Sequence, residues 1–364
     1  MEGKALRTRL DIKPAIQMGL PFNGEISSVE TERTFPVSDE RLMERVVSRE
    51  NLFGALLKVE RNAGSPGIDG MKTEELSAYL KREWPELRRQ LLNGEYIPKP
   101  VKRADIPKAE GGMRQLGIPT VLDRFIQQAL LQVLQPEWDP TFSDFSYGFR
   151  PGKSAHQAVH QTQEYLKQGY RWVVDMDLEK FFDRVNHDKL MDEVGKRVAD
   201  KRVRTLIQRF LRSGLSYQDK VMETVEGTPQ GGPLSPLLAN LILDLLDREL
   251  EHRGHRYVRY ADDCNIYVRS KRAGLRVLKS ISGYLNRRLK LRVNDAKSAV
   301  DRPWRRTFLG FTFSTRLNIR ISEKSIKRFK VRIREITKRT RGNRITFIIK
   351  ELRQFILGCK HIII

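Results

Sequence analysis

The sequence has little cysteine and no long apolar run, and each scarcity excludes a class of protein. Cys264 and Cys359 are the only cysteines, and their spacing suits neither a disulfide scaffold nor a zinc-binding module. We therefore expect a reducing, cytoplasmic setting. No segment approaches the ~20 apolar residues that a membrane span needs. The basic N-terminus lacks the apolar core of a signal peptide.

Acidic residues are too few to balance the basic ones. The 364 residues include 68 Lys or Arg against 45 Asp or Glu, which gives a formal net charge of +23 and a pI near 10.1. Residues 315–364 hold fifteen Lys or Arg against three acidic residues, a net of +12. This imbalance predicts a polyanionic partner such as nucleic acid. An apolar content of 39% is otherwise typical of a globular chain with two or three subdomains.

One tetrapeptide, Tyr260-Ala261-Asp262-Asp263, places two carboxylates side by side. The runs on either side, 257–260 and 265–268, alternate like strands, so the segment predicts a β-hairpin with its turn at or near the acids. Adjacent negative charges repel each other unless solvent or a shared divalent cation separates them. Asp is a common turn residue, so the pair alone favours solvent.

A third carboxylate, Asp177, shifts that balance toward a metal. It ends the apolar run 171–177, which predicts a strand. If this strand neighbours the hairpin, three carboxylates converge, and oxygen ligands without His or Cys suit Mg²⁺. Two ions ~3.5–4 Å apart would activate a hydroxyl and steady a pyrophosphate leaving group, with the Leu178 carbonyl as a further ligand. The alternative for Asp177 is a helix cap at the strand end.

A basic segment contains candidates for binding a triphosphate. Lys108 and Arg114 lie in a predicted β-hairpin broken at 110–112, and both either hold phosphates or are simply solvated. Gln230 lies in a glycine-rich loop before a predicted helix, where it would approach a base or sugar closely. Lys297 is a weaker candidate for neutralising the leaving group.

An aromatic pair follows Asp177 in the chain. Phe182, five residues on, would exclude a 2′-hydroxyl from a sugar beside it and so select deoxynucleotides. The alternative for both Phe181 and Phe182 is an ordinary core aromatic, which is the stronger reading for Phe181.

Helical and strand patterns alternate along the rest of the chain. The periodicity predicts helices over 38–59, 123–134, 237–250 and 273–289, another from about His187 and a basic one from about Ser322. A further strand is expected over 308–313. The hairpins require antiparallel pairing, which favours an α+β fold over a doubly wound one. Gly152-Lys153-Ser154 is no P-loop, because Tyr147 stands where that motif needs glycine.

Taken together, seven ordered blocks resemble the reverse transcriptases encoded by group II introns. The resemblance implies a right-hand polymerase fold with fingers, an antiparallel palm sheet packed on helices and a partial helical thumb. It also implies Mg²⁺-dependent synthesis of cDNA from dNTPs on an RNA template with a DNA primer. It supports Asp177, Asp262 and Asp263 as metal ligands, Phe182 as the sugar gate, and Lys108, Arg114 and Gln230 around the nucleotide. The blocks are 62–70, 106–120, 147–152, 177–183, 227–236, 260–263 and 308–311.

The same resemblance divides the chain into three parts. Residues 1–36 are expected to be a loose lead segment, 37–320 the fingers and palm, and 321–364 a partial, truncated thumb and maturase region. In the family, the region beyond the palm binds the intron RNA. The basic residues expected to contact RNA here are Lys324, Lys327, Arg328, Lys330, Arg332 and Arg334.

Two alternatives to a working reverse transcriptase remain open at this point. The first is a maturase that binds intron RNA through its basic tail while its active site is idle. The second is an RNA-templated RNA polymerase with a similar palm. Phe182 argues against the second, because selecting a ribose favours a polar partner for the 2′-hydroxyl.

Overall fold

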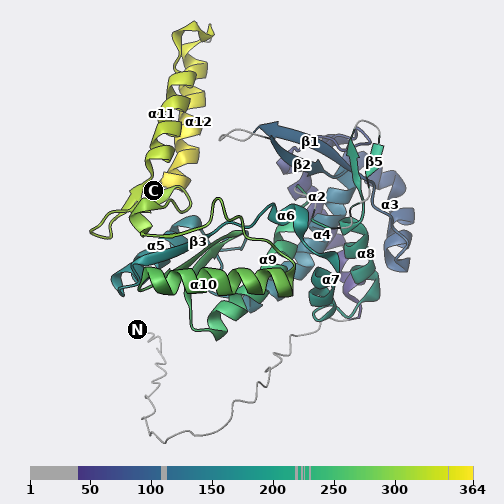
Figure 1. Ribbon diagram of the computed structural model, residues 1–364. Coiled ribbons are helices and arrows are strands. Elements are labelled where there is room, and N and C mark those ends of the chain that lie inside the picture. Colours follow the sequence, from purple (N-terminus) through teal and green to yellow (C-terminus); the bar gives the residue numbers. More distant parts are fainter. Residues whose placement is uncertain are drawn as a thin grey trace, which may run out of the picture. The chain divides into compact units, whose positions relative to one another are not determined.

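A computed structural model describes residues 40–107, 113–217, 220–222, 224, 226–228, 231–342 and 344–363 (Figure 1). The predicted lead segment, 1–36, lies outside these residues. None of the helices in the described ranges combines the length and apolar character needed to cross a bilayer.

A four-stranded antiparallel sheet, which we call the central sheet, forms the middle of the structure. Its order is β6-β7-β3-β8, with bounds Arg256–Tyr260, Asp263–Val268, Trp172–Met176 and Ala299–Asp301. The predicted strand and the predicted acidic hairpin are therefore direct neighbours. The antiparallel arrangement and the α+β class are confirmed.

Alternation along β3 divides the central sheet into two different faces. Val174 and Met176 face a core shared with α9 (Ser235–His252) and lie on the side covered by α10 (Lys271–Tyr284) (Figure 1). Val173 faces the opposite side, where α5 (Ala155–Lys167) and Phe311 complete a second cluster. Asp175 and Asp177 share the face of Val173, away from α9 and α10.

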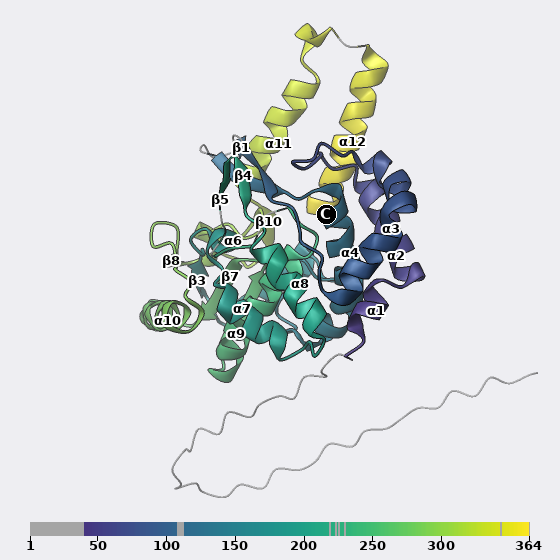
Figure 2. The same ribbon diagram turned by 90° about the vertical axis from the view of Figure 1, so that its right-hand side faces the viewer.

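A second sheet, ordered β2-β1-β4-β5, lies beside a group of helices. Its strands are Met113–Ile118, Val101–Pro107, Leu215–Tyr217 and Lys220–Met222; β1 pairs antiparallel with β2 and parallel with β4. The helices are α1 (Leu42–Val46), α2 (Arg49–Asn62), α3 (Leu76–Asn93), α4 (Val121–Trp138), α7 (His187–Gly195) and α8 (Lys201–Leu211). Figure 2 shows α1 to α4 on one side of this group.

The helix α4 is the most completely buried helix of this group. Thr120 begins it, because its hydroxyl accepts a hydrogen bond from the Asp123 N–H at 3.0 Å. Apolar residues such as Phe125, Ile126 and Leu130 are almost fully buried along it. The predicted helix over 123–134 is confirmed and is longer than expected at both ends.

Two sequence predictions were wrong in detail. The helix expected over 38–59 is interrupted, because Ser48 takes an extended backbone (φ −66°, ψ 147°) between α1 and α2. The strand expected over 308–313 is only β9 (Phe311–Phe313), which pairs with β10 (Ile319–Ile321). Leu309 and Gly310 have positive φ and form a turn instead. The strands β4 and β5 and the helix α8 were not anticipated.

The C-terminal region is a pair of helices, α11 (Glu323–Ile336) and α12 (Ile345–Ile363). Ser322 caps α11 by accepting from the Ser325 N–H at 3.2 Å, where the sequence predicted a helix start. Phe329 and Phe355 stack with ring centroids 5.5 Å apart and so join the two helices. The division of 37–320 from 321–364 as functional regions stays a prediction.

Candidate active site

Three aspartates gather at one end of the central sheet. Met176 pairs with Cys264, so continuing the register by one residue places Asp177 opposite Asp263. Tyr260 pairs with Asp263, which leaves Ala261 and Asp262 as the two-residue turn of the hairpin. Ala261 has φ +55°, a left-handed conformation that the tight turn imposes. The pairing register of these strands therefore brings the three aspartates together, as the sequence predicted for strands that are neighbours.

The negative charges at this end of the sheet disfavour ionisation of the Asp263 carboxyl. The pKa of Asp263 is raised to about 7 because surrounding protein desolvates the carboxyl and because Asp262, Asp175 and Asp177 are negative. The side chain nevertheless retains an exposed surface. Lys297 opposes this shift and contacts Asp177, with its Nζ 3.3 Å from Asp177 Oδ2. A cation at this end would therefore be strongly favoured.

The backbone around Asp177 is fixed from one side. Its N–H donates to Ser298 Oγ at 3.0 Å, and its carbonyl accepts from the Asn294 N–H at 2.8 Å. Leu178 forms a bridge with Val293. The segment before β8 thus sets the position of the first carboxylate and also carries Lys297.

The donor set fits a hard divalent cation but is not a preformed cage. Among the described residues, no three His, Cys, Asp or Glu side chains are arranged to hold a metal. Magnesium commonly takes only one or two carboxylates and completes its shell with water and substrate phosphates. Carboxylate and carbonyl oxygen donors, without His or Cys, fit that type of site.

A buried polar network holds the turn formed by Ala261 and Asp262. The Arg259 guanidinium donates to both oxygens of Asp247, at 2.8 Å and 3.1 Å from Nε, and both side chains have no exposed surface. The same guanidinium donates to Asn240 Oδ1 at 3.0 Å and to the Ala261 carbonyl at 2.9 Å. Asn240 in turn donates to the Gly148 carbonyl at 2.9 Å. These bonds tie the turn to α9.

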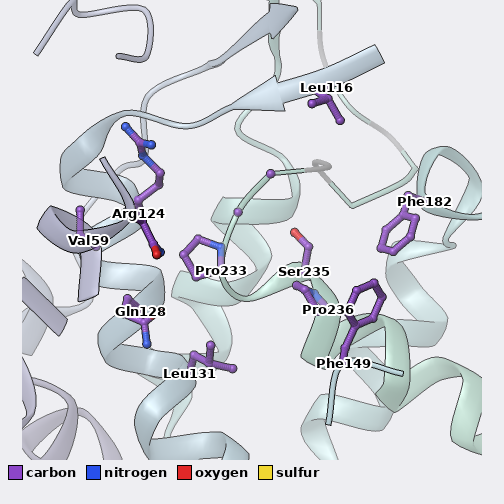
Figure 3. Close-up of a pocket in the computed structure, with 13 residues that line it drawn as sticks. Val59, Leu116, Arg124, Gln128, Leu131, Phe149, Phe182, Pro233, Ser235 and Pro236 are labelled. Carbon is purple, nitrogen blue, oxygen red and sulfur yellow. The ribbon is translucent and has the colours of Figure 1, made fainter. Parts of the chain in front are cut away.

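An open pocket of about 490 Å³ is lined by residues of β2, α4, α6 (Phe181–Arg184) and the segment that leads into α9. Figure 3 shows Arg124 and Gln128 of α4 on one side, Phe149 and Phe182 on the other, and Pro233 between them. Phe182 belongs to the short helix α6 and meets Phe149 edge to face at 6.5 Å. Polar groups on one wall and aromatic rings on the other suit a nucleotide.

The glycine-rich loop lines this pocket. Gly231 has φ +130°, and a Cβ there would lie 2.3 Å from the Gly117 carbonyl oxygen of β2. No other residue allows the loop to approach the strand so closely.

Comparisons with known proteins agree with this geometry. A family model described as "Reverse transcriptase (RNA-dependent DNA polymerase)" matches residues 106–313. The chain belongs to the reverse transcriptase family. Protein YkfC of Escherichia coli (strain K12) is 33% identical over 301 residues, which cover 72% of this chain and 79% of that protein.

Other relatives, whose printed names refer to introns, match a smaller part of their own length. Group II intron-encoded protein LtrA of Lactococcus lactis subsp. cremoris is 35% identical over 208 residues, 56% of this chain but only 32% of LtrA. Nuclear intron maturase 1 of Arabidopsis thaliana is 27% identical over 170 residues, 22% of that protein. Among solved structures, a chain of a partial Cas6-RT-Cas1–Cas2 complex is 27% identical with a TM-score of 0.44, covering 68% of this chain and 42% of that one. The family match, together with the similarity to LtrA, relates the chain to reverse transcriptases of the group II intron type, and its mixed helices and sheets are consistent with their right-hand fold.

In reverse transcriptase terms, the central sheet is the palm, and the second sheet with α1 to α4 forms the fingers. Phe182 lies at their junction, and Phe181 is buried as expected of a core residue. Arg114 lies on β2 opposite Ile106. Lys108 and Gln230 lie outside the described residues. Lys297, predicted to neutralise the leaving group, forms an ion pair with Asp177.

Sequence reasoning missed Asp175, which lies on the same face of β3 as Asp177. Arg306 binds its carboxylate at 2.6 Å and also donates to the Lys297 carbonyl at 2.7 Å. Asp175 therefore helps to fix the segment that carries Lys297. The signal was present in the sequence, because residues two apart on a strand point to the same face.

The six predicted RNA-binding residues of the tail all lie on α11 and are exposed. Arg332 is paired with Glu335 at 3.0 Å and with Glu351 at 3.2 Å. Their role stays a prediction.

Replacing Gly148 by Ala should displace the catalytic turn. A Cβ there would lie 2.2 Å from the Ala261 N, so the turn must move. Misplacing reacting groups by about 1 Å can cost roughly 100-fold in rate. We expect primer extension to fall by about that factor while circular dichroism is unchanged. Gly358→Ala, where a Cβ meets nothing within 4 Å, is the matched control; equal rates for the two variants would contradict the prediction.

Proposed function

We propose that this reverse transcriptase copies group II intron RNA into cDNA with two Mg²⁺ ions, as part of intron mobility. The observation that carries the proposal is the register of β3 and β7, which brings Asp177 beside Asp262 and Asp263. The partners would be the intron RNA as template, a DNA primer and dNTPs. We also propose a reducing, cytoplasmic setting, because the two cysteines have no pairing or metal-binding pattern.

In this proposal each group at the acidic end has a distinct role. Asp177, Asp262 and Asp263 would hold the ions, with the Leu178 carbonyl as a further ligand. When bound, Mg²⁺ would lower the pKa of the primer hydroxyl and stabilise charge on the pyrophosphate. Lys297 would move between Asp177 and the leaving group, and the Arg259 network would keep the turn in place.

The fingers would hold the incoming nucleotide. Lys108 and Arg114 would bind the triphosphate through charge-assisted hydrogen bonds. Gln230 would lie against the base or sugar from the glycine-rich loop, whose close approach to β2 is shown by Gly231. Phe182 would close the pocket on the side of the sugar.

The test is primer extension on an RNA template with a DNA primer, Mg²⁺ and dNTPs. We expect extension that depends on Mg²⁺ and is lost when a chelator removes it. Absence of extension by a folded protein that still binds intron RNA would instead support a maturase role. That second function is favoured by the exposed cations of α11.

Replacing Phe182 by Ala should relax sugar selection. The ring lines the pocket, and its removal would leave room for a 2′-hydroxyl. We expect the ratio of kcat/KM for dNTPs over rNTPs to fall roughly 10- to 100-fold, the range for one small group in a fitted pocket. Phe53→Ala, at a ring that is 62% exposed, is the control. An unchanged ratio would remove Phe182 from the site.

A further inference from the structure

The segment of the chain that contains α10 carries only positively charged side chains. Between Cys264 and Asn294 there is no Asp or Glu, whereas nine Lys or Arg occur. Six exposed cations gather at α10 and at the adjoining ends of β6 and β7, and we call them the α10 basic surface. They are Arg256, Arg269, Lys271, Arg272, Arg276 and Lys279.

The α10 basic surface lies away from the catalytic centre. A Cβ on Gly274 of α10 would meet Val300, Val268 and Val174, so the helix packs on the sheet face opposite to Asp177. Arg256 and Arg269 adjoin the sheet end opposite to the aspartates, about 17 Å away for a five-residue strand. Figure 1 shows α10 running along the palm. The cations therefore do not line the path to the acidic end.

Three of these cations form a continuous row along α10. Arg272, Arg276 and Lys279 follow each other at helical intervals of four and three residues, which places their Cβ atoms roughly 5–6 Å apart on one side. The row leads to a hollow of about 560 Å³ that Arg256, Arg269 and Arg276 also line. In that hollow the Arg269 guanidinium lies over the Tyr170 ring, 4.9 Å from its centroid.

These charges have no internal neutralisation. Among the described residues, none of the six forms an ion pair with a carboxylate. The tail differs, since Arg332 and Arg341 both reach Glu351. Six like charges on one surface repel each other, and a polyanion would relieve that repulsion.

We infer that the α10 basic surface binds the phosphate backbone of a folded RNA at a site separate from the template path. A protein partner would need apolar or aromatic anchors at the centre of the interface. Among the large apolar side chains of α10, only Leu275 is exposed, at 52%. Phosphate contacts need cations alone. The inference rests on the proposed function, because an intron RNA is long enough to occupy the cleft and this surface together.

The test compares the triple variant Arg272→Gln, Arg276→Gln, Lys279→Gln with the wild type. Affinity for a folded group II intron RNA is measured by filter binding over a series of salt concentrations. Loss of three phosphate contacts should weaken binding roughly 10- to 100-fold and lower the slope of log K against log salt by about 2 to 3. Primer extension on a short RNA template should be unchanged.

A matched variant removes three exposed charges elsewhere. Lys81→Gln, Arg82→Gln, Arg88→Gln on α3 has the same net charge as the α10 variant. If both variants bind intron RNA equally, the inference is overturned. Loss of an acidic protein partner by the α10 variant would not rescue it. An equal loss on the short template would also overturn it, by assigning α10 to the template path. Failure of the proposed function would appear separately, as a wild type without extension that still binds RNA.

Discussion

Asp263→Asn is expected to lose primer extension by about 10³-fold or more, the largest effect of any single substitution in the palm. Phosphoryl transfer depends almost entirely on positioning and electrostatic stabilisation, so removal of one charged ligand is not compensated by neighbours. Asn keeps the volume of the side chain and removes only the charge. Rates are measured under single-turnover conditions with saturating primer and template.

The same substitution should leave the fold intact. Burial and the charges of Asp262, Asp175 and Asp177 raise the pKa of Asp263, so a neutral residue there avoids desolvating a charge and relieves repulsion. We expect an unfolding free energy no lower than that of the wild type and an unchanged affinity for RNA. Asp188→Asn, at an exposed position in the first turn of α7, is the control. Extension by Asp263→Asn at the rate of this control would exclude the two-metal proposal.

Arg259→Met is expected to cause the second-largest effect, on stability as well as rate. Removing one partner of a buried ion pair leaves Asp247 as an unpaired charge, at a cost of about 3–5 kcal/mol. Asn240 Oδ1 and the Ala261 carbonyl lose their donor as well. Urea denaturation should show the lower stability, and extension should fall further than the folded fraction accounts for.

The double variant Arg259→Met, Asp247→Leu separates the two effects. An apolar pair of similar volume often restores the stability that a buried ion pair provided. The turn would still lack the guanidinium that holds the Ala261 carbonyl. We expect stability to recover and extension to stay low. Full recovery of both would mean that Arg259 acts only in folding.

Local patterns in the sequence predicted most of the strands of the palm. Strand alternation around the Tyr260-Ala261-Asp262-Asp263 turn and the apolar run before Asp177 predicted β6, β7 and β3 correctly. The sequence did not predict that β3 and the hairpin are neighbours, and the metal-site hypothesis only assumed it. In the structure they are neighbours. The roles of the three aspartates and of Phe182 stay predictions, since they concern chemistry rather than position.

The features that escaped prediction depend on contacts between distant segments. Asp247 and Asn240 occur in an apolar helix, and nothing local indicates that both meet Arg259. Arg306 lies far along the chain from Asp175, which it binds. The strand expected at Phe308 failed because Gly310 allows a turn that the apolar pattern conceals. Periodicity describes one element at a time and does not contain these pairings.

The order of strands in the palm also has a consequence for synthesis on the ribosome. β3 ends at Met176, but both of its neighbours, β7 and β8, lie later in the chain. A nascent chain therefore carries an apolar strand with two open edges until β7 has emerged and with one open edge until Asp301 has emerged, and such edges promote aggregation. Closing such long loops is slow. The candidate active site is thus assembled late, and chains that stall before β8 would need a chaperone rather than simply lack activity.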